Sequence, residues 1–77
     1  MNNKRRKELD EIYDSIEDIK YKLESILADE ENYRDNIPEN LQGSERYETA
    51  DEACDALSNA VDSVDEIFEY IEQARGR

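Results

Sequence analysis

The 77-residue chain contains no histidine and only one cysteine, Cys54. A single cysteine excludes a disulfide framework, and without histidine the usual Cys/His zinc sites are excluded as well. No apolar run approaches the roughly 20 residues of a membrane span, and the basic start, MNNKRRKELDEI, lacks the apolar core of a signal peptide. These absences predict a cytoplasmic protein that has no membrane segment and uses no metal or cofactor.

Catalytic features are also missing. The chain has no histidine to act as a general base and no glycine-rich loop to hold a phosphate. Its carboxylates form runs on what the sequence predicts to be an open surface, without the concave, dry pocket that carboxylate catalysis needs. We therefore expect a protein that is not an enzyme.

Residues that break helices are scarce and lie together. Pro38, the only proline, and Gly43, one of two glycines, both belong to the stretch NIPENLQGSERYE at residues 36–48. A residue before proline is disfavoured in a helix. Ser44 is a good helix N-cap, and Glu45 and Glu48 suit the first turn of the helix that would follow. The pattern predicts one turn, at about residues 36–44.

On both sides of this turn, apolar residues alternate at spacings of three and four, which is the heptad pattern of packed helices. The first series is Leu9, Ile12, Ile16, Ile19, Leu23 and Ile26, and the second is Tyr47, Ala50, Cys54, Leu57, Val61, Val64, Phe68 and Ile71. A short connection between helices of matched length favours an antiparallel pair. We predict an all-α, coiled-coil-like, antiparallel two-helix hairpin. It forms a single domain over 1–77, with helices at about 4–35 and 45–75.

Within this hairpin, Cys54 falls on the seam and is predicted to be a small buried core residue. Tyr33, Ile37, Leu41 and Tyr47 are predicted to form an apolar plug at the closed end.

The apolar stripes are wider than one seam. The first helix adds Tyr13 and Leu27 at e positions, and the second adds Ala53, Ala60, Ile67 and Ala74 at g positions. In an antiparallel pair e faces e and g faces g, so these additions are predicted on opposite flanks, each left uncovered. We expect a homodimer that forms a four-helix bundle. Its core and contact residues are predicted to be Leu9, Ile12, Tyr13, Ile16, Ile19, Leu23, Ile26, Leu27, Leu57, Val61, Val64, Ile67, Phe68 and Ile71.

Positively charged residues are also scarce. The chain has 22 acidic and 10 basic residues and a net charge of −12. The first helix has favourable i,i+4 pairs, such as Glu30 with Arg34. From Tyr47 to Ala74 there is no lysine or arginine. Four like-charged i,i+4 pairs there each cost about 0.2–0.5 kcal/mol.

Two interpretations of this acidic helix stay open. In the first, the carboxylates serve only solubility. Alternatively, they imitate nucleic-acid phosphates and bind a basic, nucleic-acid-binding host protein. The predicted binding residues are Glu48, Asp51, Glu52, Asp55, Asp62, Asp65, Glu66, Glu69 and Tyr70.

The two ends of the chain are basic, and Lys4, Arg5, Arg6 and Lys7 would meet Arg75 and Arg77 in a closed hairpin. We interpret this tip as a solvated end. Direct nucleic-acid binding is not expected, because a body with a net charge of −12 repels phosphate.

The stretch NIPENLQGSERYETADEACDALSNAVDSVDEIFEYIEQA resembles small acidic helical-hairpin proteins from phages and prophages of Gram-positive bacteria. Those proteins share a helix, a turn containing PE-x-LQ-x-SER, and a second acidic helix. The resemblance covers the turn and the second helix, and it carries over no catalytic residues. It implies a phage accessory protein in the host cytoplasm, of a kind that includes nucleic-acid mimics that block host defence enzymes. The alternative is a structural oligomerisation module.

Overall fold

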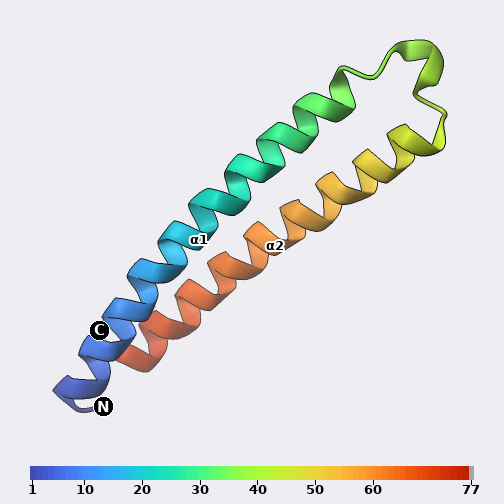
Figure 1. Ribbon diagram of the computed structural model, residues 1–77. Helices are drawn as coiled ribbons and strands as arrows, with labels where there is room; N and C mark the ends of the chain where they lie inside the picture. The colour runs from blue at the N-terminus through green and yellow to red at the C-terminus, as the bar shows by residue number, and fades with distance from the viewer. Residues whose placement is uncertain (77) are drawn as a thin grey trace.

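The protein is an antiparallel helical hairpin in a computed structural model that describes residues 1–76. Its elements are α1 (Asn3–Asp35), the short 3-10 helix η1 (Glu39–Leu41) and α2 (Glu45–Arg75). The two long helices lie side by side in a rod of 59 × 16 × 15 Å, with both chain ends at one tip and the turn at the other (Figure 1). The predicted all-α fold is confirmed. Arg77, predicted at the basic tip, lies outside the described residues.

Side chains at the helix ends explain where the helices begin and stop. Asn2 caps α1 by accepting a hydrogen bond from the Arg5 backbone N–H at 2.8 Å. Ser44 caps α2, as predicted, by accepting from the Tyr47 N–H at 3.4 Å. At the other end of α2, Gly76 adopts the left-handed conformation, with φ of 72°, that glycine takes without strain. The helices therefore lie within one residue of the predicted bounds.

The turn is ordered by backbone hydrogen bonds and by one buried side chain. The Leu41 N–H donates to the Pro38 carbonyl at 2.8 Å, which closes η1. Ile37 is 3% exposed and is among the most buried residues of the chain. Tyr47 is half-buried, but Tyr33 and Leu41 are exposed. The predicted four-residue plug is therefore wrong in two of its members, because Tyr33 and Leu41 face away from the helix contact.

The core is thin. Among the described residues, only Ile37, Ala50, Cys54 and Val64 are buried. Next to them, the rings of Tyr13 and Phe68 pack with their centroids 4.6 Å apart and tilted by 47°. All members of the predicted seam of α2 are buried or half-buried, so this seam faces α1 along its whole length.

The seam of α1 is rotated from its predicted phase. Ile12, Ile19 and Ile26 were predicted in the seam, but they are 48%, 50% and 53% exposed. The half-buried series is instead Arg6, Leu9, Tyr13, Ile16, Lys20, Leu23, Leu27, Glu30 and Arg34. Tyr13 and Leu27, predicted at the margin, therefore face α2. The cause is that Lys20 and Arg34 occupy seam positions with their aliphatic stems and reach carboxylates of α2 with their charged ends.

Candidate functional site

The acidic face of α2 consists of eight carboxylates: Glu48, Asp51, Glu52, Asp55, Asp62, Asp65, Glu66 and Glu69. Seven of them are exposed, and Asp51 is half-buried. Tyr70 beside them is also exposed, at 67%. All of the predicted binding residues therefore reach solvent from one continuous helix.

The eight carboxylates form two groups of four with the same internal spacing. Each residue of the first group, Glu48 to Asp55, has an acidic counterpart 14 residues later in the second group, Asp62 to Glu69. Fourteen residues are two heptads, so the groups lie on one face of the helix about 21 Å apart. The uncharged residues Ser58 and Asn59 separate them. Sequence reasoning missed this repeat, although an internal comparison of ETADEACD with DSVDEIFE would have found it.

One carboxylate of each group is held by a cation of α1. Lys20 Nζ donates to Asp65 Oδ1 at 2.6 Å, and Arg34 Nη1 donates to Asp51 Oδ1 at 3.0 Å. Lys20 and Arg34 are themselves 14 residues apart, so the same relationship recurs along the rod. At the open end of the hairpin the cation belongs to α2 and the carboxylate to α1. Here Arg75 donates to Asp10 at 2.6 Å.

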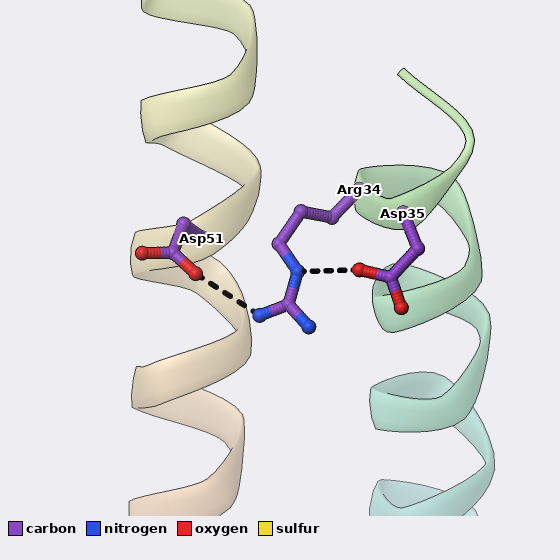
Figure 2. Close-up of polar contacts among 3 residues, drawn as sticks. All are labelled: Arg34, Asp35 and Asp51. Atoms are coloured by element: carbon purple, nitrogen blue, oxygen red, sulfur yellow. Dashed lines mark hydrogen bonds and ion pairs between the residues drawn. The ribbon is translucent and has the colours of Figure 1, made fainter. Parts of the chain in front are cut away.

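Arg34 connects the two helices near the turn. Its guanidinium lies between Asp35 of its own helix and Asp51 of α2 (Figure 2). The hydrogen bonds to Asp35 and then to Asp51 raise the pKa of Arg34. This arrangement replaces the predicted pairing of Arg34 with Glu30 inside the helix. A hydrogen bond to Asp65 likewise raises the pKa of Lys20.

These contacts define an acidic edge that includes α1. Asp10 pairs with Arg75 at this edge, and the acidic residues that follow it at seven-residue steps on α1 share its heptad position. They are Glu17, Glu24 and Glu31. The negative surface is therefore built from both helices. The interpretation of the sequence had assigned this surface to α2 alone.

Six carboxylates of the acidic face stay without a cationic partner among residues 1–76. They are Glu48, Glu52, Asp55, Asp62, Glu66 and Glu69. They are exposed and form no ion pair within the described residues, and only Asp62 lies close enough to Lys20 to interact with its charge, so most of their negative charge is directed into solvent. Each group of four thus contributes three free carboxylates.

The opposite edge of the rod is an apolar flank. We define it as Ile12, Ile19, Ile26 and Tyr33 of α1 with Ala53, Ala60, Ile67 and Ala74 of α2. A contact between Arg46 and Tyr33 shows that the two rows are neighbours. The Arg46 Nε donates to the Tyr33 hydroxyl at 2.7 Å, and the guanidinium lies 5.2 Å from the centroid of the Tyr33 ring. Arg46 precedes Ala53 by seven residues and Tyr33 follows Ile26 by seven, so both rows run down the same side of the antiparallel pair. The predicted opposite flanks are therefore wrong, because the seam of α1 is rotated.

The two edges are well separated around α2. Asp51 and Ala53 are two residues apart, which places them about 200° apart around the helix. The row beyond the apolar flank is uncharged as well: Thr49, Ala56, Ser63 and Tyr70. Every carboxylate between Glu48 and Glu69 consequently lies away from the flank.

Cys54 lies in the seam between the helices and is buried, as predicted. Loss of hydration raises the pKa of its thiol, and the nearby Arg34 charge opposes this only in part. A buried neutral thiol of this kind is a packing residue.

No group of three or more cysteine and acidic side chains in residues 1–76 is arranged to hold a metal ion. Neither described helix has an apolar stretch long enough to cross a membrane. Comparison of the chain with family models, curated proteins and solved structures finds no match.

Proposed function

We propose that this protein is a small acidic interaction protein that binds a basic, nucleic-acid-binding protein and so inhibits or sequesters it. The observation that carries this proposal is the set of six carboxylates on the acidic face that have no ion pair among the described residues, repeated in two groups along one continuous helix. A ligand that binds nucleic-acid backbone recognises mainly negative charge at regular intervals. The acidic face supplies such charge without any competing cation on its own helix between Tyr47 and Ala74.

The distribution of cations supports a binding role over solubility alone. Solubility is served by interspersed charges of both signs. Here Lys20 and Arg34 reach across from α1 to Asp65 and Asp51, so they stabilise the hairpin and leave the outer carboxylates free. The resemblance to small acidic phage proteins favours a host protein as the target, in the host cytoplasm.

A second candidate function is self-association, which the half-exposed Ile12, Ile19 and Ile26 favour. In this role the chain is a structural module whose dimer is a four-helix bundle, and the carboxylates only keep it soluble. The two functions are compatible, because the apolar flank and the acidic face lie on different sides of the rod.

The proposed binding is tested by capture from a Gram-positive host lysate, followed by release with salt and competition with DNA. The decisive variant reverses Glu52, Asp55, Glu66 and Glu69 to lysine, which leaves the ion-paired Asp51 and Asp65 unchanged. A matched control reverses four exposed carboxylates of α1 to lysine and produces the same net charge: Glu11, Asp14, Asp18 and Asp29.

We expect the wild type and the α1 control to retain one salt-released, DNA-competed basic protein, and the α2 variant to lose it. Circular dichroism checks that all three chains are equally helical. Capture of the same protein by the α2 variant would overturn the proposal. Equal loss from both variants would show that total charge, and not the acidic face, is responsible.

A further inference from the structure

The apolar flank extends along most of the rod and carries no acidic residue. Ile12 and Tyr33, at the ends of its row on α1, are 21 positions apart, or about 32 Å. The exposure of Ile12, Ile19 and Ile26 hardly changes along this distance, at 48%, 50% and 53%. The row therefore keeps one phase relative to α2 and presents a straight, continuous surface.

The chain exposes more surface than a compact monomer of its mass, as an elongated rod does, and the excess is comparable to the area of one interface. The chain exposes 5858 Å², which is about 1,000 Å² more than the roughly 4,900 Å² expected of a folded monomer of this mass. Standard interfaces bury about 800 Å² on each partner. A face of the 59 × 16 Å rod is large enough for such an interface.

The two rows of the flank differ in size in a way that suits a second copy. On α1 the row is large, with three isoleucines and Tyr33, and on α2 it is mostly alanine. Counted down the rod from the contact between Tyr33 and Arg46, Ile26 is level with Ala53, Ile19 with Ala60 and Ile12 with Ile67, so the difference in size holds over the first two levels. A surface that carries a ridge beside a matching groove is complementary to itself, as the interface of a two-fold dimer must be.

The geometry points to a second copy of this chain on the apolar flank, related by a two-fold axis parallel to the rod. In this dimer α1 of each copy lies on α2 of the other, Ile19 and Ile26 pack on the alanines of the other copy, Ile12 packs on its isoleucine at position 67, and both turns lie at the same end. The inference rests on the self-association proposed above and specifies its surface and symmetry. It does not depend on the acidic face binding a partner.

A two-fold axis perpendicular to the rod would not use this complementarity. It would place the isoleucine rows on each other and the alanine rows on each other, which leaves unfilled space along the alanines and crowding along the isoleucines. Either two-fold axis through the apolar flank directs the two acidic edges outward on opposite sides. For chains with a net charge of −12, this arrangement keeps the mutual repulsion small.

The first test measures the molar mass in solution by light scattering after size-exclusion chromatography. We expect twice the 9.1 kDa chain mass for the wild type and for the control Ser25→Asp, which adds a charge to an exposed position away from the flank. Ile19→Asp places a charge in the centre of the flank and is expected to halve the mass. A wild type that is monomeric, or an Ile19→Asp chain that keeps the dimer mass, would overturn the inference.

The second test measures the symmetry without perturbing the flank. One spin label is attached at Gln42→Cys, an exposed turn position, in a Cys54→Ala chain. If both turns lie at the same end, the distance between labels is comparable to the 16 Å width of the rods, whereas opposite ends give a distance near their 59 Å length. The long distance would exclude the proposed axis.

Lysate capture with Ile19→Asp separates the dimer inference from the proposed partner binding. The acidic face of this variant is unchanged, so retained capture shows that partner binding does not need the dimer.

Discussion

Lys20 on α1 and Asp65 on α2 lie 45 residues apart in the chain and form an ion pair of 2.6 Å. Arg34 and Asp51 repeat this relationship two heptads closer to the turn, at 3.0 Å. Both cationic residues occupy seam positions of α1. A shift of one helix by one turn relative to the other would therefore break both ion pairs. These contacts therefore determine the register of a hairpin whose apolar core is thin.

Arg34→Met tests the role of these pairs in stability. Methionine keeps an apolar stem in the seam but removes the charge, so Asp51 loses its partner. We expect a Tm several degrees lower than that of the matched control Lys22→Met, which replaces an exposed lysine of the same helix that has no ion pair among residues 1–76. Because salt screens ion pairs, the gap should narrow at high salt. An equal Tm for the two variants would show that the pair contributes nothing.

Ile37→Ala tests the buried residue of the turn. Its side chain is 3% exposed, and truncation of a buried isoleucine to alanine costs about 2–5 kcal/mol. Leu41→Ala is the control, because Leu41 lies in the same turn but is 42% exposed and should cost less than half as much. Urea unfolding at one fixed protein concentration measures both values. Equal losses would mean that Leu41 is covered in solution.

Pro38, Ser44 and the heptads were sufficient to predict the turn and both helices. The phase of α1 was not predictable in the same way, because Ile12 and Tyr13 are adjacent and either can follow Leu9 in an apolar series. The structure favours Tyr13 since the stems of Lys20 and Arg34 complete its series. A charged residue counts as exposed in a periodicity argument, although its stem can be part of a seam.

The acidic residues of the candidate site could be found from the sequence, but their division into paired and free groups could not. Whether Asp51 is neutralised depends on which residue of α1 is level with it, and this depends on the register between the helices. The same register brings Asp10 to the edge that carries Arg75. The 14-residue repeat, in contrast, is a property of the sequence alone.

The hairpin should lose stability at alkaline pH in two stages. Burial raises the pKa of Cys54 above its usual 9.0, and the hydrogen bond to Asp65 raises that of Lys20 above its usual 10.5. In both cases the unfolded chain releases its proton first as the pH rises. The stabilisation is therefore complete below pH 9.0 and falls above it, first through Cys54 and then through Lys20.

The urea midpoint measured from neutral to alkaline pH checks this order. Cys54→Ala should show no loss at the start of the alkaline range, and Lys20→Met should show a smaller loss at its upper end. If Cys54→Ala follows the wild-type curve throughout, the thiol does not contribute to the pH dependence.

Glu52→Lys should make the protein more stable and a poorer binder at the same time. Glu48 and Glu52 are a like-charged i,i+4 pair on α2, and lysine at 52 converts it into a favourable pair. Removal of the repulsion and gain of the attraction together amount to about 0.5–1 kcal/mol in the free energy of unfolding. Glu52→Gln removes only the repulsion, so it should give about half of that gain.

Binding of the captured basic protein by the same variants then separates the two explanations of the acidic face. If the carboxylates serve only solubility, Glu52→Lys raises stability and leaves binding unchanged, and nothing in the fold opposes the substitution. If they form a binding surface, affinity falls from wild type to Glu52→Gln to Glu52→Lys while stability rises in the same order. An inverse relation between stability and affinity at one exposed position would show that the repulsion along α2 is maintained for binding.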